Sequence, residues 1–218
     1  MIFNYLLNEK TFVCGGAINN GGNIIEWLLQ KFLKKSPSAE NYDDLFHSIA
    51  NVPAGCKGLL FLPYLNGERA PIWDEKSSGA FIGIQSFHNQ NYFARATAEG
   101  ICFALKEILF SLEEIASIEK IKVSGGLSKQ TVIMQILSDV LNKKIIVENE
   151  ADVSALGAAF LGLQIINPSF DIKNISSPSL FVLSPNKENV PVYQKLFLIY
   201  QSLYPNLKTT MHLLHKFL

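Results

Sequence analysis

The sequence predicts an α/β domain, and two observations lead to this fold class. The first is a short buried strand, Ile121–Val123, which stops at a Gly-Gly turn and passes straight into an amphipathic helix. The second is another apolar run at residues 144–148, directly after that helix. A strand, a helix and a strand joined by a connection of this length form a βαβ unit, so we expect parallel strands and a right-handed crossover.

The turn after the first of these strands is the first candidate for a ligand site. Ligands of open parallel sheets bind beyond the carboxyl ends of the strands, which is where Ser124, Gly125 and Gly126 lie. Two consecutive glycines let the backbone turn sharply and let another molecule come close to it. Gly-Gly pairs also occur in tight turns that bind nothing, so this turn alone leaves both interpretations open.

The N-terminal part reads as a hairpin followed by a glycine-dense loop. Residues 2–7 and 11–14 alternate as strands around a turn at 8–10, and residues 15–22 lead into a helix that runs from 24 to about 35. A glycine-rich loop at a helix N-terminus offers free backbone N–H groups, which suit a phosphate. Glycine also suits a loop whose backbone needs positive φ, so the phosphate-binding and the purely structural interpretations of this loop both stay open.

The rest of the chain alternates between strand and helix patterns. We expect a linker at 36–41, a short helix at 43–50, strands at 58–62 and 79–84, and a long helix at 94–116. The small residues at 153–160 predict a helix pressed tightly against the sheet or a ligand, with Asp152 as its N-cap. Residues 192–204 predict an amphipathic helix, which 208–217 continues after Pro205. With no internal repeat, we expect one domain over residues 1–218.

Composition excludes several classes of function. Hydrophobic residues make up 48% and charged residues 17%, which favours a sizeable core over disorder. Nineteen basic residues balance nineteen acidic ones, so we expect no nucleic-acid partner. No apolar run of 18 or more residues exists, so we expect no membrane span. Three cysteines, far apart and in no CxxC arrangement, indicate reduced thiols in a cytoplasmic protein.

Five segments in this order resemble the C-terminal half of the FGGY carbohydrate kinases. They are residues 15–22 (GGAINNGG), 62–74 (LPYLNGERAPIWD), 95–100 (RATAEG), 123–126 (VSGG) and 154–159 (SALGAA). The first segment and the C-terminal tail look most like gluconate kinases, and xylulose kinases come next. The resemblance implies an actin-like, ribonuclease-H-like ATPase domain, the second and nucleotide-binding lobe of a two-lobe sugar kinase.

The resemblance also implies a set of nucleotide-binding residues. Gly125 and Gly126 would approach the adenosine and the phosphates, and Gln130 would reach the adenine from the first turn of the next helix. Gly22 and Glu26 fall where the family contacts nucleotide from an earlier helix. Glu26 stands where some members of the family carry glutamine.

The reaction implied is transfer of the ATP γ-phosphate to a hydroxyl of a sugar or sugar acid, with gluconate as the first candidate. Phosphoryl transfer depends chiefly on positioning and charge neutralisation, so glycine-lined backbone donors and Mg²⁺ would do most of the work. By the resemblance, the aspartate base and the sugar-binding first lobe would lie upstream of Met1. We therefore expect no catalytic residue within residues 1–218, a first lobe as partner, and inactivity of this chain alone. The surface facing that lobe should be apolar and prone to self-association, for example as a homodimer.

Two other functions stay open at this point. The chain could be a non-catalytic, nucleotide-binding module of the actin-like superfamily. It could also be the nucleotide-binding βαβ domain of another enzyme class, although it contains no G-x-G-x-x-G or Walker motif.

Several polar and aromatic residues can be interpreted either as structural or as functional. His212 and His215 are spaced i, i+3, but no acidic or cysteine residue is near them in sequence, so an ordinary helix end is favoured over a metal site. Glu68, Arg69 and Asp74 are expected mainly to fix their loop by hydrogen bonds, with ligand contact as the alternative. The tryptophans, Trp27 and Trp73, are expected in the core.

Overall fold

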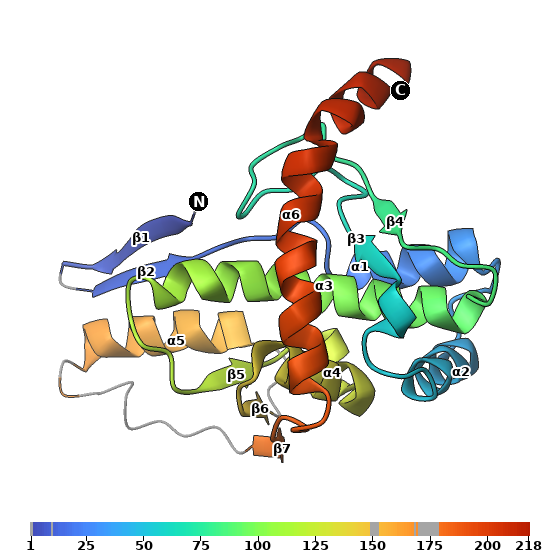
Figure 1. Ribbon diagram of the computed structural model, residues 1–218. Helices are drawn as coiled ribbons and strands as arrows, with labels where there is room; N and C mark the ends of the chain where they lie inside the picture. The colour runs from blue at the N-terminus through green and yellow to red at the C-terminus, as the bar shows by residue number, and fades with distance from the viewer. Residues whose placement is uncertain (1, 10, 149–152, 168, 170–178) are drawn as a thin grey trace.

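A computed structural model describes residues 2–9, 11–148, 153–167, 169 and 179–218. The chain is α/β, as predicted, and its long helices α3 and α6 cross near the centre of the molecule (Figure 1). The strands are β1 (Phe3–Asn8), β2 (Thr11–Gly15), β3 (Leu60–Leu62), β4 (Ala80–Ile82), β5 (Ile121–Val123), β6 (Ile145–Glu148) and β7 (Ser179–Leu183). The α-helices are α1 (Gly22–Trp27), α2 (Ala39–Ala50), α3 (Gln90–Glu113), α4 (Thr131–Leu141), α5 (Val153–Ile166) and α6 (Val190–Leu214). A π-helical segment (Leu28–Phe32) follows α1, and short 3₁₀ helices span Cys56–Gly58, Gly126–Lys129 and His215–Phe217.

The βαβ unit predicted from the sequence is present. Strands β5 and β6 are parallel neighbours, with Ile121 opposite Ile145 and Val123 opposite Val147, and β7 pairs antiparallel on the other side of β6. The predicted hairpin is β1–β2, and β3 pairs antiparallel with β4. The carboxyl end of β5 therefore lies at one end of the three-stranded sheet, where the sequence predicts a ligand site.

Two details of the β5 turn differ from the prediction. Ile121 and Val123 are only half-buried, because β5 is an edge strand that pairs with β6 alone among the described residues. The chain also does not pass straight into an α-helix. Ser128 donates from its backbone N–H and its hydroxyl to the Gly125 carbonyl oxygen, at 3.2 and 2.7 Å, which closes a 3₁₀ turn first. Gln130 is then extended, and α4 begins at Thr131.

The unpaired edge of β5 lies beside an apolar groove of about 400 Å³. Aliphatic side chains of α3 and α4 form its floor, and the segment 118–123 forms one rim. The lining residues are Leu105, Ile108, Leu109, Leu112, Ile118, Lys120, Ile121, Lys122, Val123, Leu137 and Leu141. The apolar surface expected to face the first lobe, and self-association through it, stay predictions.

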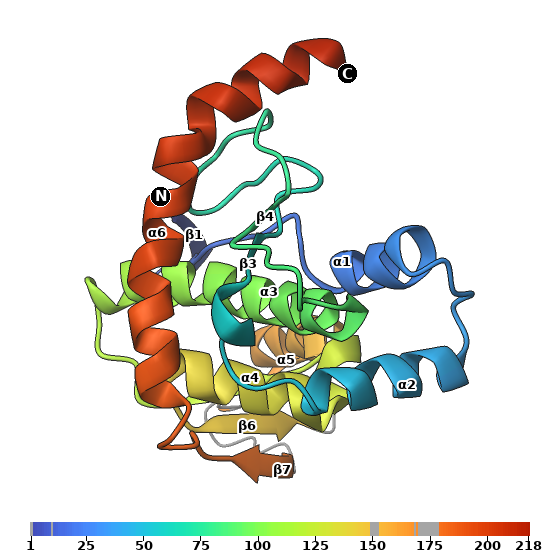
Figure 2. The ribbon, with the colours of Figure 1, turned by 45° about the vertical axis from the view of Figure 1, so that its right-hand side comes forward.

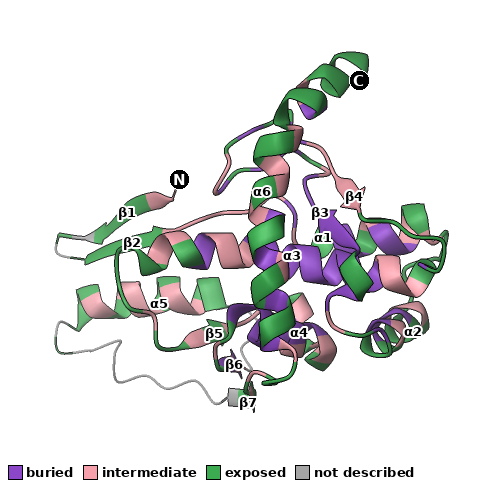
Figure 3. Ribbon diagram, in the orientation of Figure 1, coloured by how far each residue is buried: buried purple, intermediate pink, exposed green. Residues whose placement is uncertain are grey.

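Helix α5 does not pack tightly against the described part of the protein, so the expected contact with the sheet is not seen there, while contact with a ligand stays a prediction. None of its residues is buried, and a Cβ added at Gly157 or Gly162 would meet no atom within 4 Å (Figure 3). Small residues permit close packing but do not by themselves cause it, since an opposing surface is also needed. The expected N-cap, Asp152, lies outside the described residues.

Helix α2 begins earlier than predicted and shortens the expected linker. Ser38 is the N-cap, and its hydroxyl accepts a hydrogen bond from the Asn41 backbone N–H at 3.3 Å. The helix therefore starts at Ala39, and its apolar side, which includes Leu45 and Ile49, faces the core. The amphipathic C-terminal helix is confirmed, with Pro205 inside α6 rather than at a break.

The core centres on α3, whose residues from Ala94 to Ala104 are all buried. Gly100 has a packing reason for being glycine, because a Cβ there would collide with the Phe61 carbonyl oxygen of β3. The close approach lets the strand lie directly on the helix, and α6 packs on α3 as well.

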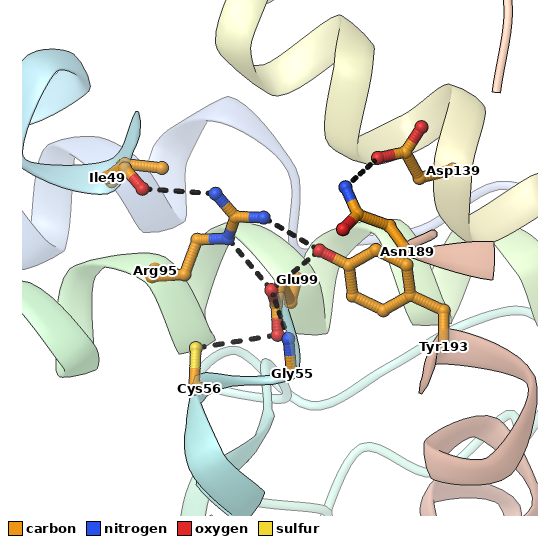
Figure 4. A network of polar contacts seen from close by, with 8 residues as sticks. All are labelled: Ile49, Gly55, Cys56, Arg95, Glu99, Asp139, Asn189 and Tyr193. Atoms are coloured by element: carbon orange, nitrogen blue, oxygen red, sulfur yellow. Dashed lines mark hydrogen bonds and ion pairs between the residues drawn. The ribbon is translucent and has the colours of Figure 1, made fainter. Parts of the chain in front are cut away.

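A buried ionic network joins α3 to three other segments (Figure 4). Glu99 Oε1 accepts hydrogen bonds from Arg95 Nε at 2.8 Å, from the Gly55 N–H at 3.0 Å and from the Tyr193 hydroxyl at 2.7 Å. Arg95 donates further to the Ile49 carbonyl oxygen and to the Tyr193 hydroxyl. Burial alone would lower the pKa of Arg95, but the Glu99 carboxylate outweighs it and the pKa is raised. The guanidinium therefore stays charged, and the network ties α2 and α6 to the centre.

Candidate functional site

A cavity of about 670 Å³ opens where the β5 turn meets α1 and α2. Its walls come from three separate stretches of the chain, and α2 lies beside α4 and opposite α1 (Figure 2). The lining residues are Gly22, Ile25, Glu26, Ala39, Tyr42, Asp43, Phe46, Ser124, Gly126, Leu127 and Gln130. This size falls within the range of ordinary small-molecule sites, roughly 300–1,000 Å³.

Four of the five residues expected to contact nucleotide line this cavity. They are Gly22 and Glu26 from α1, and Gly126 and Gln130 from the turn after β5. Gly125 adjoins the cavity without lining it, and its φ of +101° is a backbone conformation that favours glycine. The structure thus brings together residues that are about 100 positions apart in sequence.

The catalytic base expected from the family resemblance has no place among these residues. It was assigned upstream of Met1, and Met1 itself lies outside the described residues. The position of the base therefore stays a prediction.

The protein's own packing does not require glycine at position 126. A Cβ added to Gly126 would meet no atom within 4 Å, and one added to Gly22 would make only ordinary contact with Leu127, at 3.7 Å. The open space in front of Gly126 is the cavity itself. A ligand can therefore approach the backbone here more closely than any side chain would permit.

The glycine-dense loop before α1 turns out to be held mainly by the protein. The Asn19 N–H donates to Glu68 Oε1 at 2.6 Å, and Asn20 Nδ2 donates to Glu68 Oε2 at 2.9 Å. The Gly21 N–H donates to Asn23 Oδ1 at 2.8 Å. The protein itself therefore holds residues 19–21, although none of the loop's four glycines has the positive φ expected of a structural loop, and only Gly22 at the end of the loop lines the cavity.

The loop at 62–74 is fixed by hydrogen bonds, as expected, both within itself, where the Glu68 and Asp74 backbones pair at 2.9 and 2.8 Å, and to other segments. Glu68 is buried beneath the glycine-dense loop, and Arg69 donates from Nε to Asn19 Oδ1 at 2.7 Å. Asp74 accepts from the Tyr204 hydroxyl at 2.7 Å, and its Oδ2 lies 2.6 Å from His212 Nε2. Burial raises the pKa of Asp74, but the hydrogen bonds from Tyr204 and His212 outweigh it, so the pKa is lowered.

The contact with Asp74 corrects the reading of His212. The sequence shows no acidic residue near it, yet the fold places Asp74, 138 positions away, against the imidazole. His212 therefore holds α6 to the 62–74 loop, and no group of three or more potential metal ligands occurs among the described residues.

The two tryptophans differ in burial. Trp27 packs against the core and stacks on Phe61 with a centroid distance of 6.4 Å, as expected. Trp73 is 48% exposed, so its assignment to the core was wrong. It has a left-handed backbone conformation, with φ of +48°, in the loop that Asp74 anchors.

Sequence reasoning missed the wall of the cavity that α2 provides. Tyr42, Asp43 and Phe46 lie there; the short helix predicted at 43–50 contains Asp43 and Phe46, and Tyr42 lies just outside it. The signal that would have found the start of the helix is Ser38 as N-cap before an apolar pattern at 42, 45, 46 and 49. No comparable signal shows from sequence alone that this helix faces the β5 turn.

Comparison of the sequence with known proteins shows which family the chain belongs to. Residues 4–164 match the C-terminal domain of the FGGY family of carbohydrate kinases. The chain belongs to this family. It is 32% identical to a gluconokinase of Bacillus licheniformis over 212 residues, which is 93% of this chain and 41% of that protein.

Solved structures of FGGY kinases superimpose closely on the fold. A gluconate kinase from Lactobacillus acidophilus gives a TM-score of 0.85 at 32% identity, and covers 94% of this chain and 42% of its own. A ligand-bound xylulose kinase from the same organism gives 0.86 at 32% identity, over 95% of this chain and 42% of its own. The fold is therefore that of the actin-like, ribonuclease-H-like FGGY lobe, and the chain spans less than half the length of these relatives.

Two further features of the FGGY domain are the state of its cysteines and the character of its helices. Cys56 and Cys102 are free and buried and Cys14 is free and exposed, in agreement with the expectation of reduced thiols. Burial raises the pKa of the Cys56 thiol, which keeps it protonated and unreactive. Within the described stretches, no helix combines the length and the apolar character needed to cross a bilayer.

Proposed function

We propose that this chain is the nucleotide-binding lobe of a cytoplasmic carbohydrate kinase. In this role it binds ATP with Mg²⁺, and the whole enzyme transfers the γ-phosphate to a hydroxyl of a sugar or sugar acid. The single observation that carries the proposal is the cavity between β5, α1 and α2, because four residues expected from the family resemblance converge on it.

The residues around the cavity suit a nucleotide. Gly22 and Gly126 present backbone without side chains, so phosphates can come within hydrogen-bonding distance of main-chain groups. Gln130 makes no side-chain hydrogen bond within the described part of the chain, which leaves its amide to pair with the donor and acceptor edge of a base. The apolar side chains of Ile25, Phe46 and Leu127 cover the remaining walls.

Mg²⁺ fits this proposal through the nucleotide rather than through a protein cage. In phosphoryl-transfer sites the ion usually keeps several waters and binds substrate phosphates with one or two carboxylates, where it neutralises charge on the transferred group. The described residues of this lobe contain no cluster of three ligands, so we expect the ion to enter with the triphosphate.

The sugar is the less determined part of the proposal. A gluconokinase is among the most similar relatives, and this favours gluconate. A xylulose kinase superimposes equally well at the same identity, which makes xylulose the second candidate. By the family resemblance, both the aspartate base and most sugar contacts belong to a first lobe.

The test supplies that first lobe from a relative. Residues 1–218 are fused behind the first lobe of the B. licheniformis gluconokinase or of the L. acidophilus xylulose kinase, and ADP release is measured with MgATP and gluconate or xylulose. We expect turnover from at least one fusion and none from residues 1–218 alone. A general base typically contributes ~10²–10⁴-fold, and positioning of the reactants contributes up to roughly 7–11 kcal/mol.

Direct binding keeps the test independent of the fusion's folding. Isothermal titration of residues 1–218 with MgATP should show one weak site, which Gly126→Val weakens tenfold or more. Absence of binding in the unsubstituted chain, together with inactive fusions, would refute the proposal. If residues 1–218 alone turned over as fast as the fusions, the chemistry would lie within these residues and the base would have been misplaced.

A further inference from the structure

The cavity has two chemically different ends. Backbone glycines from the β5 turn and α1 form one end, where Gly126 and Gly22 lie. Helix α2 forms the other, with one turn of the helix presenting Tyr42, Asp43 and Phe46. A nucleotide has the same division, since its phosphates are anionic acceptors and its base is a flat aromatic ring.

The α2 end offers a rigid aromatic surface. Tyr42 and Phe46 are separated by four positions, and their rings are stacked with centroids 6.2 Å apart and planes at 17°. Phe46 is buried and packs in the core, whereas Tyr42 is only half-buried. The buried ring therefore holds the outer ring in place, and Tyr42 can receive a flat ligand without losing much side-chain freedom.

Two carboxylates also line the cavity, Asp43 from α2 and Glu26 from α1, one helical turn after Gly22. Glu26 Oε1 already accepts a hydrogen bond from Gln30 Nε2 at 2.7 Å, but the carboxylate of Asp43 makes no hydrogen bond or ion pair within the described residues. Carboxylates repel phosphates and accept hydrogen bonds from hydroxyl groups. The phosphates should therefore lie at the glycine end, with the sugar of the nucleotide near Asp43.

We propose that α2 is the nucleoside-recognition element, with Tyr42 stacking on the base and Asp43 accepting a hydrogen bond from a ribose hydroxyl. The inference rests on the proposed function, because it assigns an orientation to the nucleotide in the same cavity. It predicts that the lobe prefers ribonucleotides to 2′-deoxyribonucleotides, as other sites with a carboxylate on the ribose do.

The test compares three probes on residues 1–218 by isothermal titration with Mg²⁺: ATP, 2′-deoxy-ATP and inorganic triphosphate. Tyr42→Ala should weaken ATP about tenfold, which is ~1.4 kcal/mol, while Tyr42→Phe keeps the stacking and the affinity. Binding of inorganic triphosphate should not change in either variant, because it has no base. An equal loss for triphosphate would mean that Tyr42 only supports the fold, and would overturn the assignment.

Asp43 has a matched control on the same helix. Asp43→Asn should reduce the preference for ATP over 2′-deoxy-ATP at least severalfold, because a carboxylate acceptor bonds more strongly than an amide. Asp44→Asn should leave the preference unchanged, since Asp44 is equally acidic but pairs with Lys35 outside the cavity.

Each outcome separates this inference from the proposed function. Binding of ATP that neither Tyr42→Ala nor Asp43→Asn alters would overturn the role of α2 and leave the nucleotide-binding lobe standing. Absence of ATP binding in the unsubstituted chain would overturn both.

Discussion

Substitution of Glu99 should be among the most destabilising single changes in the chain. The side chain of Glu99 is 1% exposed and that of its ion-pair partner Arg95 is 8% exposed, so water screens neither. Glu99→Ala removes the acceptor of four hydrogen bonds and leaves the guanidinium buried without its counter-charge. Breaking a buried pair in this way costs about 3–5 kcal/mol, compared with a total stability of roughly 5–15 kcal/mol.

The size of the effect can be separated into charge and geometry. Glu99→Gln keeps a side-chain oxygen for Arg95, Gly55 and Tyr193 but removes the negative charge. Hydrogen bonds to charged groups contribute roughly 1.5–3 kcal/mol, and those between neutral groups 0.5–1.5 kcal/mol. The loss for glutamine should therefore be smaller than that for alanine, at about 1–3 kcal/mol.

Urea unfolding followed by circular dichroism measures these differences, and Asp44→Ala serves as the control. Asp44 and Lys35 are 3.6 Å apart with side chains 64% and 42% exposed, so removing that pair should change the free energy of unfolding by no more than about 1 kcal/mol. If Glu99→Ala also costs less than 1 kcal/mol at an unchanged denaturant slope, the network does not hold α6 and α2 to α3.

Two further substitutions test the cavity and the core. Gly126→Val should weaken MgATP binding tenfold or more, as measured by titration calorimetry. It should lower the melting temperature by no more than a few degrees, because the valine side chain enters open space. A large loss of stability would show that the turn, not a ligand, requires glycine. Burial, with a smaller contribution from Glu68, raises the pKa of Glu107 from 4.5 to about 7, and its Oε2 atom has no hydrogen-bond partner in the described residues. The native state therefore holds a proton that the unfolded state has lost, and stability should fall as pH rises from about 4.5 to about 7. Glu107→Gln should abolish that fall and be more stable than the unsubstituted chain at pH 8, by up to roughly 3 kcal/mol; parallel pH profiles for the two proteins would contradict the assignment.

The elements that the sequence predicted well are those with a strong local pattern. The parallel pair β5–β6 followed from two apolar runs flanking a periodic helix, and the hairpin followed from alternation around a short turn. Four of the five nucleotide-contacting residues, which the family resemblance rather than a local pattern predicted, line one cavity. Contact of these residues with nucleotide stays a prediction.

The features that the sequence did not predict depend on long-range contacts. The pairing of His212 with Asp74 joins residues 138 positions apart, and no local pattern indicates it. The exposure of α5 has a similar origin, because small residues at Gly157 and Ala158 show that close packing is allowed but not that a partner surface is present. The α2 wall was missed because no local pattern shows that this helix, predicted at 43–50, faces the β5 turn.

The open edge of β5 and the groove beside it bear on how long the chain would persist in a cell. Surfaces of this kind, aliphatic and next to unpaired strand backbone, are what chaperones and proteases recognise. Lys120 and Lys122 stand on the rim, and charges at such edges oppose strand-to-strand aggregation without covering the groove. Cellular abundance should therefore depend on whether another polypeptide covers this groove, so that the amount of the chain reports on its assembly.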